Sequence, residues 1–511
     1  MPRKTFYVTT PIYYVNDVPH LGTAYTTTIA DVVARFRRAM GEDVFFLTGT
    51  DEHGQKAQNA AEARGLSPRA HCDELQQRFR DAWARLSISN DDFVRTTQER
   101  HVRVVQEALA RLWKAGEIYE GTYEGWYHTS DEVFVTETEI EEKGLDRAKL
   151  VRLSEKNYFF RMGRRRDALV AHIEANPRFI RPEHRRNEVL GFLKKDLGDL
   201  CISRPKSRLS WGIPLPFAPD HVTYVWFDAL LNYASVPGLY FDDARFQRTW
   251  PADLHLMGKD ILTTHSVYWP TMLMALGVPL PTTILAHGWW TRDGAKMSKS
   301  IGNVVDPLDV AAKYGVDALR WYLVREMVVG QDADWSDARF VSRYEGDLGN
   351  EWGNLLSRTV TMLGKFTGGR IPAPDHEAGG PSEARDTAAA LLAALPGHLH
   401  DVALHKIGED VMGLLRAGNR HVDATAPWKA AKDPAKAGFV RDALYTLAET
   451  VRLASSVLTP ILPTKAPEAL RQLGITDGAA DLKTALKWGA LVPGTATVPG
   501  PVLFPRLLPP A

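Results

Sequence analysis

Cysteine is scarce in this sequence of 511 residues, and long apolar runs are absent. The two cysteines, Cys72 and Cys201, belong to no Cys-x-x-Cys pair, which excludes a disulfide framework and a thiolate zinc site. No run reaches the roughly 18 apolar residues of a membrane-spanning helix. The apolar stretch at the start is too short and too polar for a signal peptide. We therefore expect a protein of the reducing cytoplasm that does not bind membranes.

Net charge is also lacking, because 62 basic and 62 acidic side chains cancel. A chain without net charge attracts nucleic acid weakly, so any RNA site must depend on local basic clusters. Each such cluster is more readily explained as a solvated surface. The candidates are residues 164–166, 185–186 and 194–195 and the stripe of Arg204, Lys206 and Arg208.

What the chain does have is a hydrophobic share of 44%, enough for a sizeable core. Two parts of it alternate β-rich stretches with helical periods, which predicts a parallel sheet with ligands at the carboxyl ends of its strands. His20 and Asp51 both lie just past an expected strand end. The expected strands are 6–12, 44–47, 253–258 and 283–286, and the expected helices are 24–40 and 263–275.

Two other patterns mark further domains. Between about 116 and 223, short aromatic stretches alternate with charged turns, which indicates an insertion. After about Ala333, long helical periods over 344–366, 385–425 and 437–458 replace strands, with a Gly- and Pro-rich loop at 368–382. We expect an α/β protein, in which a Rossmann-like, doubly wound parallel sheet is split by an inserted connective domain and followed by an α-helical bundle. The predicted boundaries are 1–115 and 224–335 for the two halves of the sheet domain, 116–223 for the insertion, 336–490 for the helical domain and 491–511 for a Pro-rich tail.

Two short motifs carry the chemistry. His20-Leu21-Gly22-Thr23 lies at a strand-to-helix turn, where an imidazole and backbone N–H groups suit a phosphate and Gly22 permits close approach. Residues 296–300, Lys-Met-Ser-Lys-Ser, lie in a loop whose two ammonium groups can close over a triphosphate. Displacement at a phosphate depends on such positioning and electrostatics. A histidine before a helix is more often a cap, but the lysine motif is specific, and the two together favour a nucleotide site.

The two motifs are similar to the signatures of class I aminoacyl-tRNA synthetases, and the segments around them resemble the methionyl-tRNA synthetase family along nearly the whole chain. The resemblance implies activation of methionine by ATP to methionyl-adenylate and pyrophosphate. Transfer of methionine to the 3′-terminal adenosine of tRNA(Met) would follow. The stretches that carry the resemblance are 9–16, 47–54, 224–230, 258–261 and 302–307.

The resemblance also implies a methionine pocket. A thioether is soft and polarizable, so aromatic walls suit it, and Tyr14 or His265 could donate a hydrogen bond to the sulfur. Leucine could not accept that bond, which would leave a buried donor unpaired. Asp51 is expected to hold the substrate ammonium. Without the motifs, the aromatic residues would be interpreted as ordinary core. The implied pocket consists of Ile12, Tyr14, Asp51, Trp226, Ala229, Leu230, Tyr233, Ile261 and His265.

For ATP, bound as its Mg²⁺ complex, the resemblance implies that His20 and Lys299 stabilise the transferring phosphate. Lys296 would help to close the loop, and Asp260 would bind the ribose hydroxyls. Phosphates and water would hold the Mg²⁺, so no protein cage is expected. The implied catalytic residues are His20, Lys296 and Lys299, and the implied ATP contacts are His20, Gly22, Thr23, Gly258, Asp260, His287, Gly288, Lys296 and Lys299.

Anticodon recognition is expected in the helical domain. Asn354, Arg358 and Trp428 match the positions of the family that read the CAU bases. Asn354 and Arg358 are four residues apart and share one helix face. Trp428 follows Pro427 and can stack on an unpaired base. The expected partner is tRNA(Met), including the initiator.

The sequence departs from the family pattern in two places. Thr23 stands where the family usually has a second histidine, so we expect modestly slower adenylate formation. His128 and Asp131 stand where many relatives have a Cys-x-x-Cys pair, and structural zinc prefers four thiolate or imidazole ligands, so we expect no structural zinc. The chain stops at Ala511 without the C-terminal dimerisation domain of some relatives, and we expect a monomer.

There are three alternatives to this interpretation. Synthetases for leucine, isoleucine or valine carry an editing domain, for which the insertion at 116–223 leaves no room. Cysteinyl-tRNA synthetase depends on a zinc-bound, cysteine-rich site. A tRNA-binding protein on an inactive synthetase scaffold predicts loss of His20, Asp51 or the lysine motif, and all are present. Only Thr23 favours this last alternative.

Overall fold

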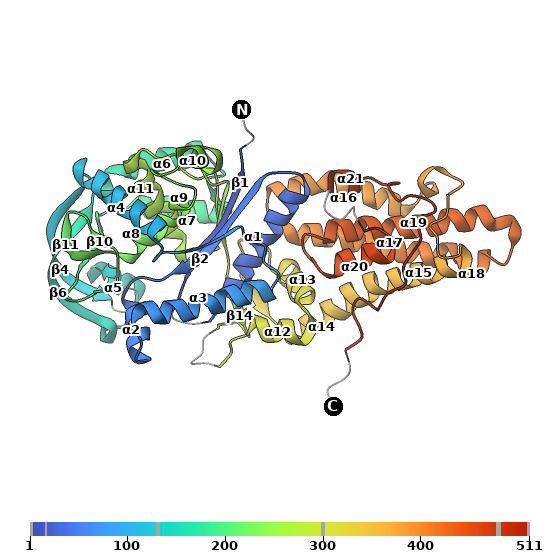
Figure 1. Cartoon of the computed structure of the whole chain (residues 1–511), viewed down its shortest axis with the longest axis horizontal. Coiled ribbons are helices and arrows are strands. Elements are labelled where there is room, and N and C mark those ends of the chain that lie inside the picture. The colour runs from blue at the N-terminus through green and yellow to red at the C-terminus, as the bar shows by residue number, and fades with distance from the viewer. Residues whose placement is uncertain are drawn as a thin grey trace. The chain divides into compact units, whose positions relative to one another are not determined.

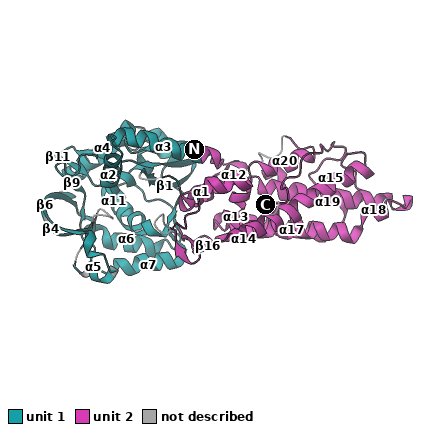
Figure 2. Ribbon diagram, turned by 90° about the horizontal axis from the view of Figure 1, so that it is seen from below, with its two compact units in different colours: residues 1–19, 45–82, 90–286 teal, residues 20–44, 83–89, 287–511 magenta. Residues whose placement is uncertain are grey.

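The computed structural model describes residues 4–15, 18–128, 133–135, 137–297, 302–476 and 482–507. The chain divides into two compact units (Figure 2). In the described part of the chain, no helix is both long and apolar enough to cross a membrane. Unit 1 comprises residues 1–19, 45–82 and 90–286, and unit 2 comprises residues 20–44, 83–89 and 287–511.

Unit 1 is built on a six-stranded sheet with the strand order β3-β2-β1-β12-β13-β7. The pairs β2–β3, β1–β12 and β13–β7 are parallel, and a parallel sheet is what the sequence predicts. The order reverses between β1 and β12, and ligands of open α/β sheets bind at the carboxyl ends of strands at such a reversal. The strands are β1 (Phe6–Tyr14), β2 (Val44–Asp51), β3 (Asp92–Arg95), β7 (Ile180–Arg181), β12 (Leu254–Gly258) and β13 (Ile284–His287).

Polar side chains inside this sheet are hydrogen-bonded to one another. The hydroxyl of Thr9 on β1 lies 2.7 Å from Nδ1 of His255 on β12, and that of Thr10 donates to the hydroxyl of Thr48 on β2 at 2.8 Å. All four residues are buried. Because an unpaired buried polar group is costly, these bonds fix the register of β1 against both neighbours.

The segment expected as an insertion forms a long antiparallel ribbon in unit 1. β4 (Ile118–His128) pairs with β6 (Leu150–Phe160) along its full length. Helices α6 (Arg166–Ala175) and α7 (Glu183–Leu193) follow. Between them, β7 joins the edge of the six-stranded sheet. This pairing is not predicted, because a two-residue strand carries no periodic signal.

In unit 2, a small sheet with the order β15-β14-β16 carries the start of the lysine motif. β14 (Trp290–Arg292) and β15 (Ala295–Lys296) form a hairpin with the two-residue turn Asp293-Gly294. The φ angles of the turn are 55° and 72°, as an Asp-Gly hairpin turn requires. β16 (Ala333–Trp335) is the last named strand of the described chain, in agreement with the predicted loss of strands near Ala333.

Helix α1 (Leu21–Ala39), predicted at 24–40, belongs to unit 2 with the C-terminal helices. The buried guanidinium of Arg320, on α13 (Val316–Glu326), donates to Asp31 of α1 at 2.6 Å and to the carbonyl of Ile461 at 2.8 Å. Although burial disfavours the Asp31 charge, this guanidinium helps to hold the pKa of Asp31 below its usual range. The buried pair thus ties α1 to the helical part of the unit.

The helical part contains long helices that lie side by side in Figure 1. The single helical stretch predicted at 385–425 forms two helices in the structure. The chain reverses between them at Val402, which has a φ of 53°. The reversal packs α16 against α17, which buries Val402 and offsets the strain of a β-branched residue in this conformation. The long helices are α15 (Asn354–Phe366), α16 (Glu383–His400), α17 (Leu404–Thr425) and α19 (Ala437–Leu458).

Candidate active site

A cavity in unit 1 lies beside the carboxyl end of β1, at the reversal of strand order. All nine residues predicted for the amino-acid pocket line it. Two further residues, Pro11 and Asn232, line it without having been predicted, and each is the direct chain neighbour of a predicted residue. The lining residues are Pro11, Ile12, Tyr14, Asp51, Trp226, Ala229, Leu230, Asn232, Tyr233, Ile261 and His265.

The walls of the cavity are aromatic. The rings of Tyr14 and Trp226 meet edge to face at 6.4 Å, and those of Trp226 and His265 at 6.1 Å. The free volume is about 20 Å³, close to the space of one water molecule.

His265 is a buried neutral imidazole whose two nitrogens are both engaged. Its Nδ1 lies 2.9 Å from the carbonyl of Ile261, which can only accept, so Nδ1 carries the proton. Nε2 then accepts from the hydroxyl of Tyr233 at 2.8 Å. Burial lowers the pKa of His265 to about 4, which keeps the ring neutral at pH 7. Of the two donors proposed for a sulfur atom, this geometry favours Tyr14 over His265.

The acidic residue of the cavity, Asp51, ends β2 and is 3% exposed. Two positions on, His53 donates from Nδ1 to Asp228 at 2.7 Å, and His101 approaches the other carboxylate oxygen at 2.8 Å. Asp228 is fully buried; although burial disfavours its charge, the two imidazoles hold its pKa below the usual range. Asp228 lies on α8 (Val225–Leu230), which also supplies Trp226 to the cavity. The network thus joins two walls of the cavity.

The first motif caps helix α1 in unit 2. Nδ1 of His20 accepts from the N–H of Gly22 at 3.1 Å, and Thr23 forms the second half of a capping box with the backbone of His20. A Cβ on Gly22 would lie 3.0 Å from the His20 ring, so Gly22 makes room for that ring. His20 is exposed at a helix N-terminus, where backbone N–H groups favour an anion.

His287 and Gly288 belong to the same unit as the first motif. Nδ1 of His287 donates to the carbonyl of Gly288 at 2.6 Å, and Nε2 lies 2.6 Å from the hydroxyl of Thr26 on α1. A Cβ on Gly288 would lie 2.1 Å from the carbonyl oxygen of Gln331. Backbone packing alone therefore requires glycine at 288, whatever its role toward a nucleotide.

The lysine motif begins on the exposed hairpin of unit 2. The ammonium of Lys296 lies 4.6 Å from the centre of the Trp289 ring, a cation–π contact. Asp334 accepts from the N–H of Gly294 at 3.0 Å and from the hydroxyl of Thr291 at 2.8 Å, which fixes the hairpin. Lys299 lies outside the described residues.

The remaining two predicted ATP contacts belong to unit 1. Gly258 ends β12, and Asp260 lies in the single turn Lys259–Ile261 that follows, with an exposed side chain. Because β12 flanks the reversal of strand order, both residues lie at the edge of the sheet where a nucleotide is expected. Ile261 ends the same turn and lines the cavity described above, so this turn borders that cavity.

The predicted anticodon residues lie on the helical domain. Asn354 is exposed at the start of α15, and Arg358, one turn later, donates to Asp423 of α17 at 3.2 Å. Trp428, in the short helix Pro427–Ala430 just after α17, is 39% exposed. A tryptophan with this exposure is available to stack on a base.

No metal site is found within the described chain, where no group of three or more His, Cys, Asp and Glu side chains is arranged to hold a metal ion. His128 is buried at the end of β4, and Asp131 lies outside the described residues. Both cysteines are buried, and burial raises the pKa of Cys72 to about 12.

Comparison with known proteins agrees with this geometry. Residues 6–147 and 143–360 match the family "tRNA synthetases class I (M)", and residues 373–508 match the "anticodon binding domain of methionyl tRNA ligase". A methionine–tRNA ligase of Caldanaerobacter subterraneus is 44% identical over 99% of this chain and 79% of its own length. One of Streptomyces coelicolor is 43% identical over 99% of this chain and 97% of its own. The Mycobacterium tuberculosis methionyl-tRNA synthetase in complex with methionyl-adenylate superposes with a TM-score of 0.94, at 41% identity over 98% of this chain and 100% of that one.

Proposed function

The chain belongs to the methionyl-tRNA synthetase family of class I, and we propose on this premise that it activates methionine with ATP and transfers it to tRNA(Met). The proposal is carried by one observation, the cavity at the reversal of strand order that combines a buried carboxylate with aromatic walls. The methionine carboxylate attacks the α-phosphate of ATP, and pyrophosphate leaves. The hydroxyl of the 3′-terminal ribose of the tRNA then attacks the carbonyl carbon, and AMP leaves.

In the first step, the cavity selects the amino acid. Asp51 would accept from the substrate ammonium, and its burial strengthens this contact. Tyr14 would donate to the thioether. Nε2 of His265 would accept from the hydroxyl of Tyr233 and so orient that ring. The apolar wall of Ile12, Leu230 and Ala229 would exclude water from the side chain.

The nucleotide would be bound by groups that carry or favour positive charge. His20 and the backbone N–H groups at the start of α1 suit the phosphates, and Lys296 and Lys299 would neutralise the charge that develops at the leaving pyrophosphate. Thr26 and His287 would hold the start of α1 in place. ATP enters as its Mg²⁺ complex, and the ion would be held largely by phosphate oxygens and water.

The tRNA would be recognised through its anticodon. Asn354 and Arg358 would read base edges, and Trp428 would stack on an unpaired base. We propose that initiator and elongator tRNA(Met) are both substrates, because they share this anticodon. The cysteine usage supports a location in the reducing cytoplasm and the absence of structural zinc.

The proposed function is tested by amino-acid-dependent ATP–pyrophosphate exchange with the purified chain. Methionine is expected to stimulate exchange, whereas leucine, isoleucine and cysteine are not. Charging of tRNA(Met), compared with a leucine tRNA, tests the second step. Stimulation by another amino acid contradicts the assigned pocket, and absence of exchange with retained tRNA binding supports the inactive scaffold.

A further inference from the structure

Two acidic residues stand side by side at the end of β2, and only one of them reaches the amino-acid cavity. Asp51 lines the cavity, whereas Glu52 does not. Glu52 is fully buried, and its carboxylate accepts from the hydroxyls of Thr50 at 2.9 Å and Thr97 at 2.5 Å. Two hydroxyls do not cancel a charge, so this carboxylate needs a cation.

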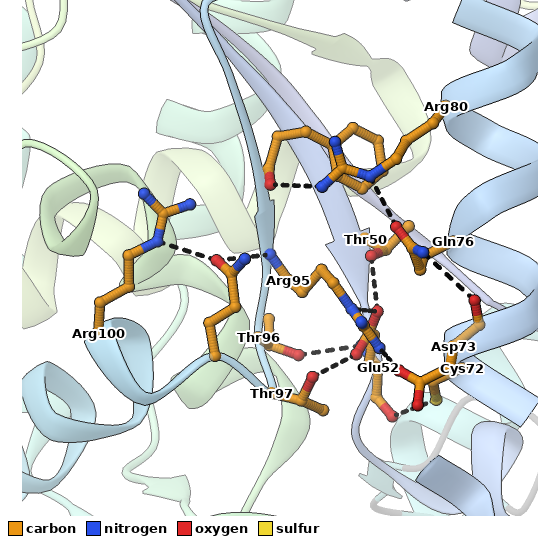
Figure 3. Close-up of polar contacts among 12 residues, drawn as sticks. Thr50, Glu52, Cys72, Asp73, Gln76, Arg80, Arg95, Thr96, Thr97 and Arg100 are labelled. Atoms are coloured by element: carbon orange, nitrogen blue, oxygen red, sulfur yellow. Dashed lines mark hydrogen bonds and ion pairs between the residues drawn. The ribbon is translucent and has the colours of Figure 1, made fainter. Parts of the chain in front are cut away.

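Arg95 supplies that cation. It ends β3, where it lies directly opposite Thr50 of β2, and its Nε donates to Glu52 at 2.7 Å. Its Nη2 donates to Asp73 on α3 (Pro68–Arg85). Figure 3 shows the guanidinium lying between the carboxylates of Glu52 and Asp73. The Arg95 side chain is 16% exposed, so solvent screens the contact with Glu52 little.

The backbone of Glu52 is held as firmly as its side chain. Its N–H donates to the hydroxyl of Thr96 at 3.0 Å. Its carbonyl accepts from the indole N–H of Trp211 at 2.5 Å and from the thiol of Cys72 at 3.5 Å. Because Asp51 directly precedes this residue, the position of its carboxylate depends on the same contacts.

We propose that Arg95 is a positioning residue for amino-acid binding. It neutralises the Glu52 carboxylate and thereby keeps the Asp51 carboxylate in a fixed place. The substrate ammonium then meets the negative charge of Asp51 alone. The inference rests on the proposed function, because it assigns the ammonium to Asp51. Without Arg95, a buried Glu52 carboxylate has no cation; it must draw in water or a proton, or shift toward the cavity and displace Asp51.

The test separates charge balance from simple packing. Arg95→Met keeps the length of the side chain and removes its charge; it is expected to raise the KM for methionine in pyrophosphate exchange by about 30-fold, and the KM for ATP by less than about threefold. Glu52→Gln removes the charge that needs balancing. The double variant Glu52→Gln/Arg95→Met is therefore expected to restore the KM for methionine to within about threefold of the parent.

Arg78→Met is the matched control, since Arg78 lies on α3 and forms an exposed pair with Glu74 that does not touch Glu52. It is expected to leave both KM values unchanged, and thermal unfolding of every variant identifies loss of fold. A KM for methionine within about twofold of the parent in Arg95→Met overturns the inference, as does a double variant no better than Arg95→Met. If the parent itself shows no methionine-dependent exchange, the proposed function fails instead.

Discussion

The amino-acid cavity of unit 1 and the proposed phosphate-binding groups of unit 2 differ in the burial of their polar side chains. In the cavity, His265 and Tyr233 are buried and bonded to each other, and the adjacent Asp228 is buried between two imidazoles. In unit 2, His20 and Lys296 are exposed, at the end of a helix and on a hairpin. An amino acid that must be distinguished from similar amino acids requires fixed partners in a low dielectric, whereas a triphosphate is bound by charge.

This difference predicts where substitutions are costly. A change in the cavity leaves a buried group without its partner, which costs far more than the loss of an exposed contact. A change among exposed cations loses an interaction that water and salt already weaken. The effects should therefore decrease from the cavity, through the network behind it, to the start of α1.

The largest effect is expected for Asp51→Asn. The amide keeps the size of the side chain but removes the charge that the substrate ammonium requires, and loss of one partner of a buried charge pair costs roughly 2–5 kcal/mol. The KM for methionine in pyrophosphate exchange should rise by about 100-fold or more, with little change in the KM for ATP. Asp243→Asn, an exposed aspartate of the same unit, is the control. Equal changes for both substrates would remove Asp51 from the amino-acid site.

A smaller effect is expected for Asp228→Asn, behind the cavity wall. A carboxylate accepts from His53 and His101 together, whereas an amide offers one oxygen and turns an N–H toward the other imidazole. The KM for methionine should rise about tenfold, because Trp226 and Leu230 on α8 lose their fixed place. Ser235→Ala removes the far contact of His101 at 2.9 Å and a hydrogen bond to the carbonyl of Asn232 at 3.2 Å, and should cost less. A fall in thermal stability without a change in KM would make the network purely structural.

How much of the fold and of the candidate site could be predicted depends on whether the signal in the sequence is local. The strands near the motifs follow from short apolar runs, and the nine cavity residues follow from segments that the family resemblance aligns one by one. The pairs within the Asp228 network are 175 and 127 residues apart, and no periodicity connects them. Arg95 and Glu52 meet only because β2 and β3 pair in one register.

Other features were missed for a related physical reason. The reversal at Val402 places a β-branched residue at a positive φ, which propensity argues against and which only the packing of α16 on α17 makes favourable. Likewise, the family resemblance places Gly288 near the nucleotide, and the structure adds a backbone approach from Gln331 that no side chain permits. Tertiary contacts decide both positions, and a single sequence does not contain them.

The smallest effect is expected at Thr23, where the family usually has histidine. Its hydroxyl donates to the carbonyl of His20 at 2.7 Å and accepts from the His20 N–H at 3.0 Å, so it serves the helix cap. Thr23→His should raise the rate of pyrophosphate exchange a few-fold, by adding a donor to the phosphate side, at a capping cost of about 1 kcal/mol in stability. Thr23→Ala separates the two effects, since it loses the cap without gaining a ring. An exchange rate in Thr23→His that is unchanged or reduced would show that the hydroxyl already does what the histidine does, and that the exposed side of the site tolerates exchange of its polar groups.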